Sequence, residues 1–170
     1  MISNFRVFLV RSVDITPEIL GKIISLKRQH WKYSIESNEK WISENLNADD
    51  HHLWIENNSG EIIAYLNLVF LNVSFDGKIK KVLGIGNVCV AINESGKGIG
   101  YLLMLICNYY IRNIDMPAIL LCKKTLSKFY KKTGWKEFNG NTTIKGKDYQ
   151  ELVMFIESPD VATIEIEKNF

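Results

Sequence analysis

The chain has 170 residues, of which 46% are apolar and 24% are charged, and its 21 Lys and Arg residues against 19 Asp and Glu residues give a net charge of +2. This composition is typical of a globular chain of one domain and excludes a disordered one. A membrane span needs about 18 consecutive apolar residues, whereas the longest run, residues 101–107, has seven. The first residues lack the basic and then apolar layout of a signal peptide. We therefore expect a cytoplasmic protein with one domain over residues 1–170 and no membrane partner.

The three cysteines and three histidines do not form a metal motif. No Cys-x-x-Cys pair occurs, and the histidines show no ligand spacing with the cysteines. Each cysteine lies in an apolar stretch, which favours a buried, reduced thiol. We expect no metal, and we expect free thiols at Cys89, Cys107 and Cys122.

The first third of the chain predicts a strand and two helices. Residues 5–10 form a short apolar run suited to a strand, and Asp14 to Pro17 carries the signals of a helix start. Apolar residues at helical spacing continue to about residue 29. The aromatic segment His30-Trp31-Lys32-Tyr33 then ends this helix, and Ser37 opens a second one.

The middle of the chain has a strand-like pattern. Residues 53–55 and 62–71 flank the turn Asn57-Asn58-Ser59-Gly60, which predicts a hairpin. A second turn at Asp76-Gly77 leads into a long strand over residues 79–90. These three strands are expected to form an antiparallel meander.

The last part alternates helices and strands. A helix over about residues 98–113 is apolar on nearly every side, which places it centrally. The remaining elements are expected at residues 118–122 (strand), 126–132 (helix), 135–138 (strand) and 151–156 (strand). The sequence thus predicts an α/β (α+β) protein. Its mixed, mostly antiparallel sheet has six to seven strands and about four flanking helices, in the order β-α-α-β-β-β-α-β-α-β-β.

A glycine-rich loop joins the long strand to the apolar helix. Gly96, Gly98 and Gly100 follow a strand that ends in Val88-Cys89-Val90. Glycines let a backbone approach a ligand closely, and the first N–H groups of a helix are unpaired at its positive end. This combination predicts a cradle for a phosphate or pyrophosphate. The loop lacks the Walker A pattern and the third glycine of a dinucleotide fingerprint.

Two motifs in their order resemble the GNAT superfamily of N-acetyltransferases. Gly96-Lys97-Gly98-Ile99-Gly100 resembles its acyl-CoA signature, and Phe129-Tyr130-Lys131-Lys132-Thr133-Gly134-Trp135 resembles its Tyr-x-x-x-Gly-aromatic segment. The similar element order covers residues 5–156. The N-terminal third also resembles the aminoglycoside 2′-acetyltransferase branch.

The resemblance implies acetyl-CoA as co-substrate. The strand backbone would pair with the pantetheine arm, and the loop N–H groups would hold the pyrophosphate. Two positions depart from the family: Ser95 stands where Arg or Gln is usual, and Lys123 stands where many members have Asn. The implied cofactor-binding residues are Val88, Cys89, Val90, Ser95, Gly96, Lys97, Gly98, Ile99, Gly100, Tyr101, Lys123 and Phe129.

The resemblance also makes Tyr130 the general acid. A phenol of pKa ~10 is protonated at pH 7 and can donate a proton to a thiolate whose conjugate acid has a pKa of ~8.5. No Asp or Glu lies in residues 79–90, where some members place a base. The base candidates are a water held by backbone carbonyls or one of four side chains: His30, Glu36, His51 and His52.

The acceptor is expected to be a primary amine of a small molecule, such as an amino sugar or aminoglycoside. His30, Trp31 and Tyr33 are the candidate acceptor-binding residues, because aromatic faces suit sugars or flat apolar acceptors. Two alternatives keep the fold: a protein N-acetyltransferase and a non-catalytic module that binds CoA or a nucleotide. Exposed sheet edges are compatible with a homodimer.

The net charge is an average of unlike parts. Six lysines and no acid lie within residues 123–136, so the rest of the chain has 15 basic against 19 acidic residues. A solvated helix face explains such a run. The resemblance suggests instead that it flanks the phosphates of CoA. Nucleic-acid binding through this run is the remaining alternative, although the whole-chain charge does not favour it.

Overall fold

The computed structural model describes residues 4–170, and the chain divides into two compact units. Of the described residues, the first unit comprises 4–69 together with 87–104, and the second comprises 70–86 and 105–170. Three elements begin in one unit and end in the other: β3 (Ile62–Phe75), β4 (Lys78–Val90) and α3 (Ile99–Ile114). The single domain over residues 1–170 stays a prediction.

The first unit contains the first hairpin of the predicted meander. β1 (Arg6–Arg11) pairs antiparallel with β2 (His51–Glu56), and β2 pairs antiparallel with the start of β3. The β2–β3 turn contains Gly60 at a φ of 77°, a left-handed conformation that glycine adopts without steric cost. The hairpin is therefore confirmed.

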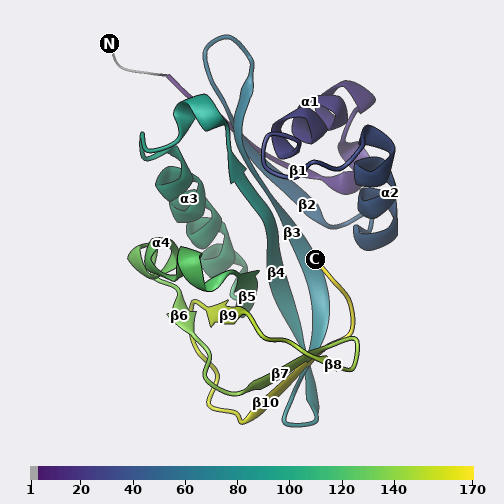
Figure 1. The fold of residues 1–170 in the computed structure, drawn as a ribbon, viewed down its shortest axis with the longest axis vertical. Coiled ribbons are helices and arrows are strands. Elements are labelled where there is room, and N and C mark those ends of the chain that lie inside the picture. Colours follow the sequence, from purple (N-terminus) through teal and green to yellow (C-terminus); the bar gives the residue numbers. More distant parts are fainter. Residues whose placement is uncertain (1–3) are drawn as a thin grey trace. The chain divides into compact units, whose positions relative to one another are not determined.

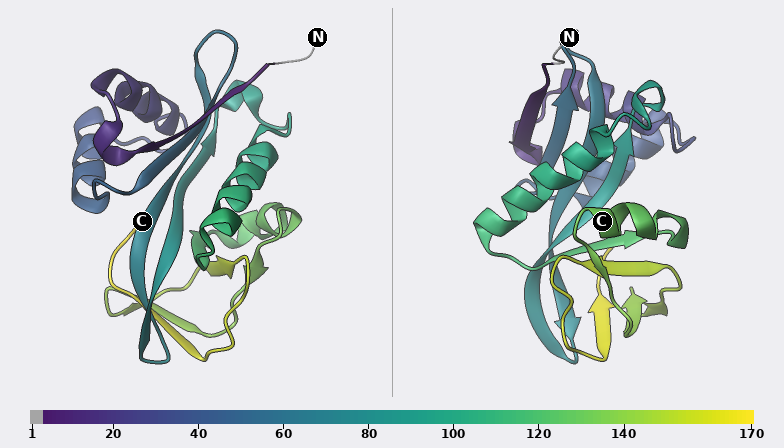
Figure 2. Two further views of the ribbon diagram at one scale, coloured as in Figure 1. Left: turned by 180° about the vertical axis from the view of Figure 1, so that it is seen from behind. Right: turned by 90° about the vertical axis from the view of Figure 1, so that its left-hand side faces the viewer.

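Two helices cover one face of these strands. α1 (Pro17–Lys27) has Pro17 at its first position and is capped by the Thr16 hydroxyl, which accepts from the Ile19 N–H at 3.3 Å. α2 is Ile35–Asn45 and starts before the predicted Ser37, because the Ser34 hydroxyl accepts from the Ser37 N–H at 3.0 Å and caps the helix. Figures 1 and 2 show both helices on one face of the strands and the start of α3 on the other. The short 3-10 turns of this unit are η1 (Ser12–Asp14) and η2 (Ile92–Glu94).

The second unit contains the parallel part of the sheet. β5 (Ala118–Cys122) pairs parallel with β4, β9 (Leu152–Phe155) pairs antiparallel with β5, and β6 (Lys136–Glu137) pairs antiparallel with β9. β5 has its predicted boundaries. The helical elements here are the later part of α3, the 3-10 turn η3 (Lys124–Leu126) and α4 (Ser127–Lys132).

Three strands of the second unit were not predicted: β7 (Asn141–Ile144), β8 (Lys147–Asp148) and β10 (Thr163–Ile166). β10 is held by Asp76, whose carboxylate accepts from the N–H groups of Ala162 and Thr163 and from the Thr163 hydroxyl. These bonds lower the pKa of Asp76. With them the described residues form ten strands instead of six to seven, while the predicted fold class, a mixed and mostly antiparallel sheet with four α-helices, is confirmed.

Two further sequence predictions concern the cysteines and membrane spans. Cys89, Cys107 and Cys122 are free and buried, as predicted. None of the helices within residues 4–170 is long and apolar enough to cross a membrane.

His52 stands out in the core of the first unit because the residue is 1% exposed and both of its ring nitrogens have hydrogen-bond partners. Nε2 lies 3.0 Å from the Ser12 hydroxyl and Nδ1 lies 2.7 Å from the Tyr65 hydroxyl. Burial, followed by the nearby charges of Lys27 and His51, lowers the pKa of His52 to about 4. The folded protein therefore holds this ring neutral.

This depressed pKa makes the stability of the fold fall in mild acid. Between pH 6.5 and 4 the unfolded chain protonates His52 while the folded chain does not, so stability present above pH 6.5 is lost as the pH falls. The loss is at most about 3 kcal/mol. Urea unfolding at pH 7 and pH 4.5 should show a smaller decline for His52→Gln than for the wild type. Equal declines would show that His52 does not titrate in this way.

Candidate active site

Strand β4 changes conformation at Asn87. This residue has a φ of 52°, a left-handed backbone that Asn tolerates better than most residues. Its Nδ2 donates to Oδ1 of the buried Asn67 on β3 at 2.6 Å. The parallel ladder between β4 and β5 covers Leu83 to Ile85 only, so the last residues of β4 lie beyond it.

Those last residues carry backbone groups that suit a strand-like ligand. The Ala91 N–H donates to the Ile63 carbonyl of β3 at 2.8 Å. Because successive residues of a strand point their polar groups in opposite directions, the N–H and C=O groups of Val88 and Val90 point away from β3. Val88 and Val90 are half-buried and Cys89 is buried. An extended arm can add here by the hydrogen bonding of β-augmentation.

The end of α1 is attached to this strand. The ring Nε2 of His30 lies 2.6 Å from the Val90 carbonyl oxygen, and since a carbonyl only accepts, Nε2 carries the proton and Nδ1 is left as the basic nitrogen. Gln29 also accepts from the Ile92 N–H at 2.9 Å. The structure therefore brings one predicted acceptor residue against the predicted cofactor strand. Trp31 follows with its ring 5.8 Å from that of His30, and Tyr33 is 64% exposed.

The glycine loop has the geometry of an anion cradle. Gly96 and Gly98 have φ values of 78° and 85°, and a Cβ added at either would meet no atom within 4 Å. The backbone conformation, and not packing, therefore requires glycine here. The Leu102 N–H makes the first bond of α3, to the Gly98 carbonyl at 3.0 Å. N–H groups before it have no partner within the helix and form its positive end: they belong to Ile99, Gly100 and Tyr101.

The side chains of the loop add little charge. Ser95 and Lys97 are exposed, and Lys97 Nζ lies 3.3 Å from a carboxylate oxygen of Glu94. The cradle is therefore made of backbone N–H groups.

Tyr130, Phe129 and Lys123 belong to the second unit. Tyr130 is 5% exposed, and its ring packs edge-on against Phe129 with centroids 4.9 Å apart. Its carbonyl accepts from the N–H groups of Thr133 and Trp135 at 3.0 and 3.1 Å. The glycine and the aromatic residue of the motif thus follow the last turn of α4, and their N–H groups bond to carbonyls of that turn. Lys123 is exposed.

The structure separates the base candidates. His52 is held neutral in the core, and Glu36 is a weaker base than usual because its own backbone N–H and the Ser34 side chain lower its pKa. Burial lowers the pKa of His51. Of the four candidate side chains, His30 is the one with a hydrogen bond to the β4 end. Burial raises the pKa of the Cys89 thiol to about 12, which argues against a nucleophilic thiolate.

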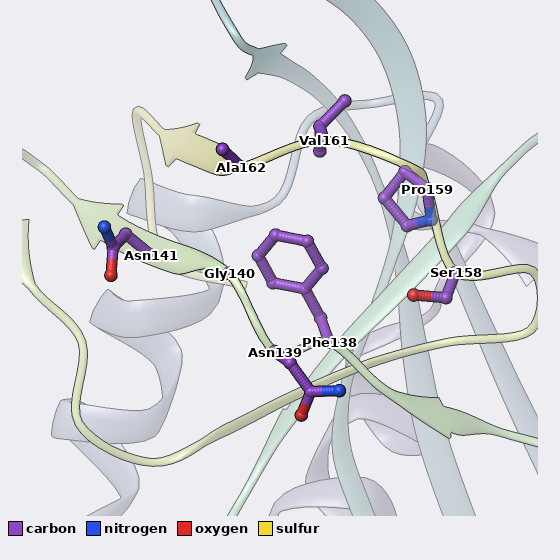
Figure 3. Close-up of a pocket in the computed structure, with 8 residues that line it drawn as sticks. All are labelled: Phe138, Asn139, Gly140, Asn141, Ser158, Pro159, Val161 and Ala162. Atoms are coloured by element: carbon purple, nitrogen blue, oxygen red, sulfur yellow. The ribbon is translucent and has the colours of Figure 1, made fainter.

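The second unit has a surface pocket with a volume of about 490 Å³, whose lining residues are drawn in Figure 3. The Phe138 ring points into it toward Pro159 and Val161. No predicted site residue and no titratable side chain lines this pocket, so it lacks the groups that acyl transfer needs. Its lining residues are Phe138, Asn139, Gly140, Asn141, Ser158, Pro159, Val161 and Ala162.

No protein-family model and no curated protein matches the sequence, but solved structures match the fold. ElaA of Escherichia coli aligns with a TM-score of 0.67 at 19% identity, over 91% of this chain and 100% of that one. An acyl-CoA N-acyltransferase from Pseudomonas aeruginosa aligns with a TM-score of 0.66 at 19% identity, over 89% of this chain and 99% of that one. The E. coli GNAT family N-acetyltransferase YhbS was crystallised in complex with CoA. It aligns with a TM-score of 0.67 at 14% identity, over 97% of this chain and 89% of that one. The chain has the fold of the GNAT N-acetyltransferases.

Two residues that sequence reasoning missed lie near β4 in this GNAT fold. Lys27 is 4% exposed although it is charged, and Asn67 is fully buried. Both had a signal: Lys27 lies four residues after the buried Ile23 on the apolar face of its helix, and Asn67 interrupts the apolar strand of residues 62–71. Within residues 4–170, no group of three or more His, Cys, Asp or Glu side chains is placed to hold a metal ion.

The cradle can be tested with a matched pair of glycines. Gly98→Ala should weaken CoA binding at least 10-fold, because a side chain disfavours the left-handed backbone that directs the loop N–H groups. Gly77→Ala has a similar φ of 80° and an equally open Cβ position but lies in the β3–β4 turn, so it should leave CoA affinity unchanged. Isothermal titration calorimetry measures both. Wild-type affinity in Gly98→Ala would exclude the loop as the cradle.

Proposed function

We propose that this protein transfers an acyl group, acetyl in the first instance, from acyl-CoA to a primary amine of a small molecule. The observation that carries the proposal is the pairing, within the first unit, of an anion cradle at residues 96–101 with an open strand edge at Val88 and Val90. This pair suits a ligand with a pyrophosphate and an amide-containing arm. The GNAT fold supports the same activity.

The residues divide the binding of acetyl-CoA between them. The N–H groups from Gly96 to Tyr101 would hold the pyrophosphate, and the backbone of Val88, Cys89 and Val90 would pair with the pantetheine arm. His30 already occupies the Val90 carbonyl, which leaves the Val90 N–H and both groups of Val88 for the arm. Acetyl-CoA supplies the thioester, and direct attack by the amine needs no covalent enzyme intermediate. Ser95, Lys97, Lys123 and Phe129 are proposed as lesser contacts.

The amine must lose a proton before it attacks. An alkylammonium of pKa ~10.4 is neutral in about one molecule in 10³ at pH 7, which costs roughly 4–5 kcal/mol without a base. We assign the base to His30, acting through Nδ1. Its hydrogen bond to Val90 fixes the ring at the strand that would hold the thioester.

The departing thiolate needs a proton or a hydrogen bond. Tyr130 is assigned as general acid, because a phenol is protonated at pH 7 and lies within two pKa units of a thiol. Trp31 and Tyr33 offer aromatic faces to the acceptor. An amino sugar or aminoglycoside-like amine is therefore the first acceptor class to test.

The acid role gives a kinetic prediction. Tyr130→Phe removes the phenolic hydroxyl and should lower kcat by about 10²-fold, in the range of general acid catalysis. The KM for acetyl-CoA should stay unchanged, because the aromatic ring remains. A thiol-release assay over an amine panel measures both constants. Tyr149→Phe, which removes another partly buried hydroxyl of the second unit, is the control and should keep full activity. Full activity in Tyr130→Phe would refute the acid role, and no CoA binding by the wild type would refute the proposed function.

A further inference from the structure

A patch of polar side chains lies on the face of the first unit's sheet that α1 and α2 cover. His52 of β2 is directly opposite Asn67 of β3, and paired residues share a face. Tyr65 is two residues from Asn67 and lies on the same face. Asn87 of β4 bonds to Asn67. With Lys27 from α1, these five residues form what we call the buried donor patch.

The donor patch contains a cation without a counter-ion. Lys27 is 4% exposed, and the ion pairs formed within residues 4–170 do not include it. Its ammonium nitrogen lies 4.9 Å from the centre of the Trp41 ring. Burying an ammonium is costly unless it is paired, so this side chain is kept at the expense of stability.

A second donor in the patch also lacks an acceptor. Asn67 is 0% exposed, and its Nδ2 makes no hydrogen bond. Its Oδ1 is occupied by Asn87. An unsatisfied buried amide in a native structure calls for an explanation, and an acceptor atom from a ligand supplies one.

The other groups on this face add no negative charge. Burial, with the nearby charge of Lys27, lowers the pKa of His52 to about 4. Burial raises the pKa of Tyr65 well above its usual value and that of Cys89 to about 12, so both stay protonated. Burial also lowers the pKa of Lys27 to about 8, which leaves it largely cationic at pH 7.

The patch adjoins the elements of the proposed reaction. Cys89, whose backbone belongs to the proposed pantetheine strand, is two residues from Asn87, and Asn87 is half-buried. The carbonyl of Lys27 accepts from the N–H groups of His30 and Trp31 at 3.0 Å each. Lys27 thus begins the segment that we assign to the acceptor.

We infer that the acceptor amine carries an anionic group, a carboxylate or a phosphate, and that Lys27 and Asn67 bind it. This inference rests on the proposed function and narrows its acceptor class. A positive environment that contains no anion repels a simple cationic amine. It favours an acceptor whose anion pairs with the ammonium of Lys27 and accepts from Nδ2 of Asn67.

Matched acceptor pairs test this inference. One pair is an α-amino acid and its carboxamide, and the other is an amino sugar with and without a 6-phosphate. Calorimetry on the CoA-loaded protein should show at least 10-fold tighter binding of the anionic member in one pair, and that pair identifies the anion as carboxylate or phosphate. Equal binding within both pairs, or no binding of any member, would overturn the inference.

Variants then assign the preference to the patch. Lys27→Met, similar in length and uncharged, should abolish the preference and leave the neutral member within 2-fold of its wild-type affinity, and Asn67→Ala should reduce the preference. Lys22→Met is the control, because Lys22 is an exposed lysine of α1 paired with Glu18. A preference that survives Lys27→Met would overturn the inference.

Two further measurements separate this inference from a purely structural role of Lys27 and from the proposed function. Without ligand, Lys27→Met should unfold at a temperature equal to or above that of the wild type, whereas a purely structural role against Trp41 would lower it and contradict the inference. Thiol release is measured in parallel. If the protein prefers the anionic acceptors but releases no thiol, the proposed function is refuted and the anion site is supported. If it releases thiol but binds anionic and neutral acceptors equally, the proposed function is supported and the anion site is refuted.

Discussion

The left-handed backbone of Asn87 is the constraint on which the site depends. A regular strand would keep its polar groups in the ladders on both sides, but the β4–β5 ladder covers Leu83 to Ile85 and goes no further. Asn67, fully buried, holds the side chain of Asn87 at 2.6 Å. Such backbone conformations persist where the surroundings determine them. At Asn87 the unfavourable backbone conformation leaves the polar groups of the strand end available to an extended ligand.

The two ends of this strand segment would bind different parts of the reactants. Beyond Val90 the chain turns through two left-handed glycines into α3, which gives an exposed cradle of N–H groups for a polyanion. At its other end, Asn87 belongs to the buried donor patch, which also contains Lys27. In the proposed function, backbone groups would bind the part of the ligand that every acyl-CoA shares. Side chains would bind the acceptor, in which enzymes of one fold differ.

Charge is distributed in two different ways in this chain. The six lysines between residues 123 and 136 are all exposed, where water screens them, and Lys131 is paired with Glu137 at 3.0 Å. Lys27 is one charge, but it is buried and unpaired, so its field acts in a medium of lower dielectric. A net charge of +2 conceals both features. The buried Lys27 supports a ligand site more strongly than the exposed lysines do, because burying an ammonium opposes folding unless a partner binds it.

Much of the fold and the loop geometry of the candidate site could be predicted from the sequence, because local chemistry determined them. Pro17 marked the start of α1, the turn before β3 marked the hairpin, and the clustered glycines marked the tight turn into α3. β7 and β8 could not be predicted, since they are only two to four residues long, are mostly polar, and owe their pairing to tertiary contacts. The conformation of Asn87 and the unpaired state of Lys27 also depend on neighbours distant in sequence, such as Asn67 and Trp41.

A crystal structure of the chain with CoA is the most direct test of the central claim, that the end of β4 and the glycine loop together bind acyl-CoA. We expect pyrophosphate oxygens about 3 Å from the N–H groups of the loop and of the first turn of α3. We also expect a pantetheine arm hydrogen-bonded to the backbone of Val88 and to the Val90 N–H. CoA held elsewhere, for example by the lysines of residues 123–136 alone, or absent at saturating concentration, would contradict it.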